Sequence, residues 1–382
     1  MPTYLHQLDS WPELSWNSAE LVSALNQIHH QHGRLLGKLE VVGSRVQQRT
    51  MLQPLSAQMV RSFEDEGLYL DQLKVASSIA RRLGIESPGF ATSDLETDIV
   101  VKMMLDATQN CEAPLTEERL FTWYATLHAS LFPTDFSALS EAAVSYRKTP
   151  SRVVSKTTGK ICLEAVKPSR IASEMKTFIY WFETPDSTQK LDPVVKAGLA
   201  LLRFLIIRPF DDGNERIARM LCEMLLARAA GNPSSARSPL QYFGLSSQLI
   251  SGQADCYHIL ELIQEDESDV STWLLWFLDC LACALKENEL LFSKAMAKLE
   301  FWHRYETLSF NERQRKVINV KLEGLEEKLR TSNWARIASC SHDTALRDIE
   351  DLMYKGVLEK ETAGGRSTSY RLVGLPLSAN SG

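Results

Sequence analysis

Two arginines one helical turn apart follow a tight polar loop in the middle of the chain, and together they suit the binding of phosphate groups. The loop runs from Arg208 to Glu215, and Arg216 and Arg219 come directly after it. Gly213 permits the turn in which backbone amides face an anion, and a helix start adds unpaired N–H groups. Arginines at i and i+3 share one helix face and can clamp two phosphates. The alternative is an ordinary connection between two helices.

Two apolar helices are expected to position this loop. Residues 193–207 form a strongly apolar run, and apolar residues recur at helical spacing after the loop, at positions 217, 220, 221, 224 and 225. The sequence therefore predicts a buried helix, a short loop and a second buried helix.

The segment resembles the signature loop of Fic-domain proteins, which reads His-x-Phe-x-(Asp or Glu)-Gly-Asn-Gly-Arg-x-x-Arg. The matching positions are Phe210, Asp212, Gly213, Asn214, Arg216 and Arg219. Two positions depart from the pattern: Arg208 stands where the family has its histidine, and Glu215 stands where it has the second glycine.

The resemblance implies transfer of AMP from ATP to a hydroxyl group of a target protein. Asp212 would hold Mg²⁺, Gly213 and Asn214 would line the anion hole beside Glu215, and Arg216 and Arg219 would bind the outer phosphates. By the same resemblance, Tyr257 would lie on the adenine side of the pocket. The implied cofactors are ATP and Mg²⁺, and the target protein is unknown.

The two departures affect the chemistry in different ways. Arg208 cannot accept a proton, because a guanidinium with a pKa above about 12 offers no lone pair. A Glu215 carboxylate about 5 Å from a phosphate would cost roughly 3 kcal/mol at an effective dielectric constant near 20. Because the two charges are opposite, we expect the side chains to approach one another across the loop and to leave AMP transfer weak or lost. The alternatives are a decayed enzyme and an inactive regulator that acts through protein contacts or DNA.

A second motif precedes the core. Ser62, Glu66 and Gly67 match the family's inhibitory pattern of Ser or Thr, three residues, Glu, then Gly or Asn. The resemblance implies that Glu66 pairs with Arg219 and obstructs the γ-phosphate. The alternative is an ordinary helix with an acidic end, terminated by a glycine, which would have the same sequence pattern.

A short hairpin is predicted between residues 146 and 167, from β-branched and apolar residues at 153–154 and 161–163. In Fic proteins such a hairpin, called the flap, holds the target segment by strand addition.

The C-terminal region predicts three helices, at 311–329, 333–339 and 343–355, and a hairpin of residues 357–360 and 370–373. This order is typical of a winged helix, in which Thr344 and Arg347 would face the major groove of DNA and Arg366 would lie at the wing tip. Residues 331–373 hold six basic and six acidic side chains, so charge does not favour DNA binding. A structural or dimerisation role is the alternative.

The whole chain has 382 residues, 44% of them hydrophobic, and a formal net charge of -6, which argues against a surface coated for nucleic acid. The seven cysteines lack metal-ligand spacing and suit a reducing cytoplasm, and no membrane segment is expected. We predict a mainly α fold with an N-terminal helical domain (1–90), a Fic-type core carrying the small flap (91–300) and a winged helix (301–382). By analogy with the family, we also expect a homodimer.

Overall fold

The computed structural model describes residues 4–42, 44–64, 69–85, 92–131, 145–154, 159, 161–185, 190–230, 245–263, 269–324, 327–361 and 368–374. The chain divides into two compact units, residues 1–288 and 289–382. Within the described residues, no helix is both long enough and apolar enough to cross a membrane.

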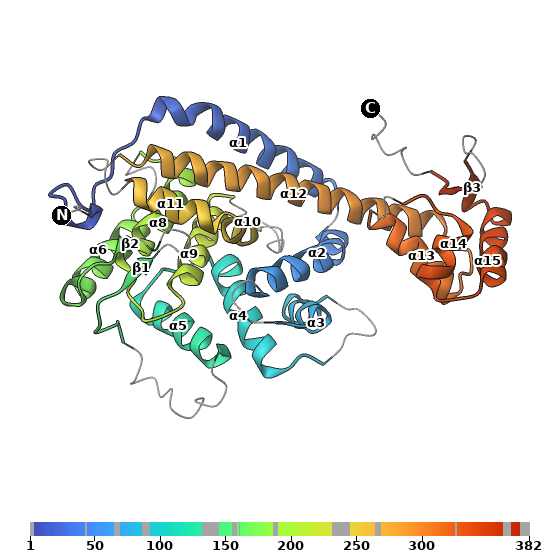
Figure 1. The fold of residues 1–382 in the computed structure, drawn as a ribbon, viewed down its shortest axis with the longest axis horizontal. Coiled ribbons are helices and arrows are strands. Elements are labelled where there is room, and N and C mark those ends of the chain that lie inside the picture. Colours follow the sequence, from blue (N-terminus) through green and yellow to red (C-terminus); the bar gives the residue numbers. More distant parts are fainter. Residues whose placement is uncertain are drawn as a thin grey trace. The chain divides into compact units, whose positions relative to one another are not determined.

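The first unit is almost entirely helical, which confirms the predicted fold class (Figure 1). Its helices are α1 (Ser18–Glu40), α2 (Ser44–Glu64), α3 (Gln72–Leu83), α4 (Leu95–Gln109), α5 (Glu117–Leu131), α6 (Ile171–Glu183), α8 (Pro193–Ile207), α9 (Asn214–Ala229), α10 (Leu245–Ser251), α11 (Gln253–Ile263) and the start of α12 (Ser271–Arg304). Two short 3₁₀ turns, Leu5–Gln7 and Pro168–Arg170, are also present among the described residues.

Helices α8 and α9 form the centre of this unit and carry the loop between them. Helix α8 begins where the Asp192 side chain accepts a hydrogen bond from the amide of Val194, with Pro193 in the first turn. Every residue from Val194 to Ile207 is buried, so the helix is enclosed on all sides. A fully buried helix is a rigid support for whatever follows its last residue.

The predicted hairpin is confirmed as a two-stranded antiparallel sheet of β1 (Arg152–Val154) and β2 (Ile161–Glu164). Arg152 pairs with Glu164 and Val153 with Leu163, and the register shifts between Val153 and Val154. Most of the residues that join the two strands lie outside the described part of the chain.

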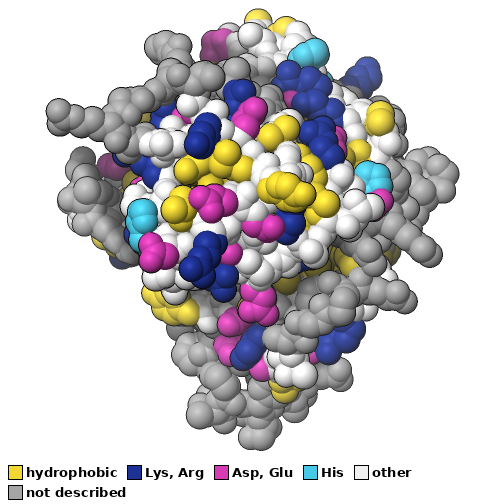
Figure 2. Space-filling model, turned by 90° about the vertical axis from the view of Figure 1, so that its right-hand side faces the viewer, with side chains coloured by type: hydrophobic (Ala, Val, Ile, Leu, Met, Phe, Trp, Pro, Cys, Tyr) yellow, Lys and Arg dark blue, Asp and Glu magenta, His cyan; other side chains and the backbone are white. Residues whose placement is uncertain are grey.

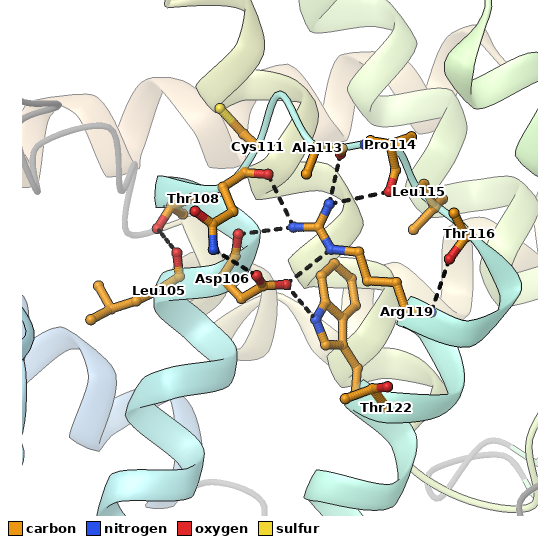
Figure 3. Close-up of polar contacts among 12 residues, drawn as sticks. Leu105, Asp106, Thr108, Cys111, Ala113, Pro114, Leu115, Thr116, Arg119 and Thr122 are labelled. Carbon is orange, nitrogen blue, oxygen red and sulfur yellow. Dashed lines mark hydrogen bonds and ion pairs between the residues drawn. The ribbon is translucent and has the colours of Figure 1, made fainter. Parts of the chain in front are cut away.

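Arg119 of α5 makes several hydrogen bonds to the end of α4 (Figure 3). The Arg119 guanidinium donates to the Asp106 carboxylate at 2.9 Å and to backbone carbonyls that include those of Asp106, Asn110 and Ala113. The Trp123 indole donates to the same carboxylate. Because these carbonyls lie at and just beyond the end of α4, Arg119 satisfies groups that the helix leaves unpaired.

The second unit contains α13 (Glu312–Leu322), α14 (Thr331–Ala338) and α15 (His342–Tyr354), followed by the antiparallel strands β3 (Leu358–Lys360) and β4 (Tyr370–Leu372). All three helices pack on a core that includes Val317, Trp334 and Ile349. The prediction of one helix over residues 311–329 was wrong: α13 ends at Leu322 and is followed by Gly324, whose φ is 109°. Leu329 instead bridges to Tyr370 beside the hairpin.

Candidate functional site

The loop between α8 and α9 has a residue with left-handed backbone conformation at each end. Arg208 ends α8 with φ 45° and donates its amide to the carbonyl of Phe204 at 2.9 Å. Gly213 has φ 69° and precedes the first residue of α9. Left-handed backbone suits glycine, whereas at Arg208 the surrounding contacts must hold it.

One buried arginine supplies those contacts. Arg147 donates from its side chain to the carbonyls of Arg208 (2.6 Å), Ile207 (3.2 Å), Thr149 (2.7 Å) and Val166 (2.5 Å). Its amide also donates to the carbonyl of Pro209. Arg147 therefore ties the end of α8 to the segments that flank the flap strands. Burial and then the neighbouring Arg208 lower the pKa of Arg147, which still remains a cation at neutral pH.

Asn214 closes the loop from inside. Its fully buried side chain accepts a hydrogen bond from the amide of Phe210 at 3.0 Å and donates to the carbonyl of the same residue at 2.8 Å. Phe210 is also fully buried and stacks on Tyr124 with ring centroids 4.3 Å apart. An amide that donates and accepts at one residue fixes the loop more strongly than a single bond.

The two residues that depart from the Fic pattern form an ion pair. Arg208 Nη1 lies 2.5 Å from Glu215 Oε1, and the exposed fractions of the two side chains are 13% and 25%. This confirms the expectation that the opposite charges meet across the loop. Burial opposes ionisation of Glu215, but the charge and hydrogen bond of Arg208 outweigh it and hold the pKa of this carboxyl below its ordinary value.

The two motif arginines in α9 are both buried, with exposed fractions of 4% for Arg216 and 7% for Arg219. The Arg216 guanidinium lies over the ring of Phe63 from α2, 4.7 Å from its centroid. Phe63 itself is 1% exposed. Helix α2 therefore covers the face of α9 that carries the first of the two predicted phosphate ligands.

A cavity of about 30 Å³ lies beside the loop, and its lining includes Glu215, Arg219, Cys256 and Tyr257. This gathers three residues that the sequence assigned to one pocket. Pockets that bind small molecules usually measure about 300–1,000 Å³, so in this conformation the cavity does not fit an adenine nucleotide. An adenine nucleotide would fit here only if the surrounding segments moved apart.

Among the described residues that line the cavity, no side chain is suited to replace the missing histidine as a base. Burial, and then the charge of Glu215, raise the pKa of Tyr257 to about 12, so its hydroxyl is protonated at neutral pH. Burial likewise raises the pKa of the Cys256 thiol. Glu215 is ionised, but a lowered pKa and the bound Arg208 make it a weak proton acceptor.

Asp212, the predicted metal ligand, is exposed at the tip of the loop, and one carboxylate oxygen accepts the amide of Gly213 at 2.7 Å. Mg²⁺ commonly takes one or two protein carboxylates and completes its shell with water and phosphate oxygens. A single exposed carboxylate fits that use. Within the described residues, no group of three or more His, Cys, Asp or Glu side chains is placed to hold a metal.

Several predicted residues cannot be placed. Glu66, Gly67 and Arg366 lie outside the described residues, and only the backbone of Ser62 is described, within α2. Thr344 takes part in the cap of α15, where its amide donates to Ser341 Oγ.

The sequence did not reveal the roles of Arg147 and Phe63. Both contacts join segments that are far apart in the chain, and neither residue stands in the loop motif. Phe63 directly follows Ser62, the first residue of the predicted inhibitory pattern, but is not itself part of that pattern.

A larger cavity of about 620 Å³ lies between α4 and α5, and its described lining includes none of the predicted site residues. Three of its polar wall residues, Asp106, Arg119 and Thr122, form hydrogen bonds within the fold. The loop between α8 and α9 is therefore the stronger candidate site.

Comparison with known proteins places this loop within a family. Residues 114–226 match the Fic/DOC family, and residues 4–85 match a domain of unknown function, DUF4172. The chain is 31% identical over 68 residues to protein adenylyltransferase fic-1 of Caenorhabditis elegans. The matched segment covers 18% of this chain and 13% of that protein. It is 32% identical over 113 residues to protein adenylyltransferase Fic of Drosophila grimshawi, covering 30% of this chain and 20% of that protein.

A Fic family protein from Desulfovibrio desulfuricans shares the fold, with a TM-score of 0.50 and 16% identity over 96% of this chain and 100% of the other. The curated relatives are matched over a small part of their own length, so their activity is not carried over as a whole. The chain therefore contains a domain of the Fic/DOC family, and the loop from Arg208 to Arg219 lies inside it.

Proposed function

We propose that this protein is an auto-inhibited Fic-type protein that can hold an adenine nucleotide but does not transfer AMP at a normal rate. The Arg208–Glu215 ion pair carries the proposal, because it places a guanidinium at the position of the base and pairs it with the carboxylate that replaces the second glycine. The chemistry would need a proton acceptor for the attacking hydroxyl, and a guanidinium cannot serve.

The residues expected to bind the phosphates support the proposed nucleotide binding. Arg216 and Arg219 share the face of α9, and Asn214 and Gly213 shape the helix start as an anion site requires. When bound with Mg²⁺, ATP would supply the phosphates that these residues hold, and Asp212 would hold the metal. The small sheet of β1 and β2 would receive a target segment by strand addition.

Inhibition by the segment around Glu66 is supported by the position of α2. Phe63 packs on Arg216, so the end of α2 lies against the signature helix, and the cavity on that helix measures only about 30 Å³. Withdrawal of this segment would open the site.

Two measurements test the proposal. Isothermal titration calorimetry with ATP and Mg²⁺ should show tighter binding for Glu66→Gly than for the unchanged protein, whereas the matched variant Glu64→Gly should leave the affinity unchanged. The unchanged protein and Glu66→Gly should also be incubated with Mg²⁺ and ATP labelled at the α-phosphate. Neither incubation should leave a covalent label on any protein band. Equal affinity in Glu66→Gly and Glu64→Gly would contradict the inhibitory assignment, and rapid labelling of the unchanged protein would contradict the loss of transfer.

A further inference from the structure

One carboxylate of α12 bonds to two helices that flank the candidate site. Glu287 Oε1 accepts a hydrogen bond from Arg61 Nη2 of α2 at 2.7 Å, and Glu287 Oε2 accepts one from Gln248 Nε2 of α10 at 3.0 Å. Helices α2 and α10 also contact each other, and both lie next to α12 in Figure 1. Glu287 therefore holds α2 and α10 together, with one oxygen for each helix.

These two helices carry different parts of the site. In α2, Phe63 lies on the guanidinium of Arg216. In α10, Leu249 and Ile250 line the cavity of about 30 Å³ whose lining also includes Arg219. An adenine nucleotide would enter this cavity only if its walls moved apart. The helix that covers α9 and the wall that must move are therefore joined through one carboxylate.

A buried hydrogen bond next to Glu287 fixes the preceding part of α2. Gln58 Nε2 donates to Asn288 Oδ1 at 2.6 Å, and the exposed fractions of the two residues are 3% and 5%. Such a bond is costly to break, because no water replaces the lost partner. The ion pair of Arg61 and Glu287 is different, because its side chains are 47% and 24% exposed and water can replace it. The last turn of α2, beyond Gln58, is therefore the part that can open.

We propose that Glu287 is a positioning residue that couples closure of the last turn of α2 over Arg216 to closure of the α10 wall of the cavity. This inference rests on the proposed inhibition by the segment around Glu66. A nucleotide that enters the cavity displaces α10 and removes Gln248 from the carboxylate. The carboxylate can then rotate and holds Arg61 less well, because an exposed ion pair is weak unless its geometry is fixed. By reciprocity, opening of α2 raises the affinity for the nucleotide by the same factor.

The rival trigger is nucleic acid bound to the second unit, because α12 continues into that unit and its Phe301 packs in the core there. Figure 2 views the molecule from the side on which Figure 1 draws α15, and basic, acidic and apolar side chains are intermixed on this face. Ion pairs such as Arg336–Glu327 and Arg371–Glu359 neutralise basic side chains of the unit. This mixture of charges gives little attraction for phosphates, so the structure favours the nucleotide as the trigger.

Hydrogen–deuterium exchange of the full chain without nucleotide tests the role of Glu287. Glu287→Ala should raise the exchange rates of amides in the last turn of α2 and in α10 about threefold, since both helices lose a bond. Glu300→Ala makes the same change at an exposed position of the same helix and should leave both rates unchanged. Arg61→Glu should also speed exchange in α2, and the double variant Arg61→Glu/Glu287→Arg should restore the slow rate. Equal rates in Glu287→Ala and Glu300→Ala would overturn the proposal.

The same variants with ATP and Mg²⁺ test the coupling. By calorimetry, Glu287→Ala should bind ATP about threefold more tightly than Glu300→Ala, matching its faster exchange. ATP should also speed exchange in the last turn of α2 in the unchanged protein, and should have less effect in Glu287→Ala. Bound ATP that leaves this exchange unchanged in the unchanged protein would overturn the proposal. Faster exchange in Glu287→Ala with the same ATP affinity would support the role of Glu287 in closure and would contradict the proposed inhibition by α2 instead.

Discussion

The ion pair between Arg208 and Glu215 should contribute measurably to stability. We consider Arg208→Met, which keeps the apolar stem and removes the charge, and Glu215→Gln, which keeps the shape of the carboxylate. Removing one partner of a buried ion pair costs about 3–5 kcal/mol. Glu215 is a quarter exposed and lies in the first turn of α9, where the helix dipole favours a negative charge. We therefore expect Arg208→Met to lower the free energy of unfolding by about 2 kcal/mol.

A double-mutant cycle at pH 7, measured by urea denaturation, isolates the interaction itself. We expect a coupling energy of about 1.5 kcal/mol between Arg208 and Glu215. The matched pair Arg152 and Glu164, with N···O 3.1 Å and an arginine that is 57% exposed, should couple by less than about 0.5 kcal/mol. A coupling below about 0.3 kcal/mol for Arg208 and Glu215 would refute the reasoning.

The pH dependence of this coupling has a definite sign. Burial acts to raise the pKa of Glu215, but Arg208 lowers it below the ordinary value of 4.5. A carboxyl whose pKa is lower in the folded state stabilises the fold above the unfolded pKa. The coupling should therefore be complete above about pH 5 and should disappear as the pH falls through the folded pKa.

Three further predictions concern the surroundings of the site. Phe63→Leu should lower the free energy of unfolding by about 2 kcal/mol in urea denaturation, because Arg216 loses its ring contact and the core loses volume. Arg119→Lys should cost about 2–3 kcal/mol, because one ammonium cannot reach all the carbonyls at the end of α4, whereas the exposed Arg81→Lys should cost less than about 0.5 kcal/mol. Burial, and then the charge of Arg170, lower the pKa of His6 from 6.5 to about 4, so stability should fall as the pH drops from 6.5 toward 4. His6→Gln should flatten that slope.

The sequence predicted the central elements well because their signals are local. The apolar run from 193 to 207 begins after Asp192 and with Pro193, and α8 has the same bounds as predicted. The flap strands were found from β-branched residues at 153–154 and 161–163. The approach of Arg208 and Glu215 was predicted from charge alone, since the loop is short enough to bring them together.

The remaining features depend on contacts between distant segments. Nothing in the local sequence indicates that Arg147 binds four carbonyls around the end of α8, or that Phe63 lies on Arg216. The predicted helix over residues 311–329 was too long because the apolar spacing continues past Gly324, where the backbone turns. The small volume of the cavity beside Tyr257 depends on packing that no motif encodes.

Restoring the family's residues at positions 208 and 215 tests the central claim most directly. The triple variant Arg208→His/Glu215→Gly/Glu66→Gly regains a base, removes the carboxylate and releases the predicted inhibitory residue. It should be incubated with Mg²⁺ and ATP labelled at the α-phosphate, with the single variant Glu66→Gly as the matched control. We predict covalent label on the triple variant and none on the control. An unlabelled triple variant that still folds and binds ATP would contradict the claim that Arg208 and Glu215 are what prevent transfer.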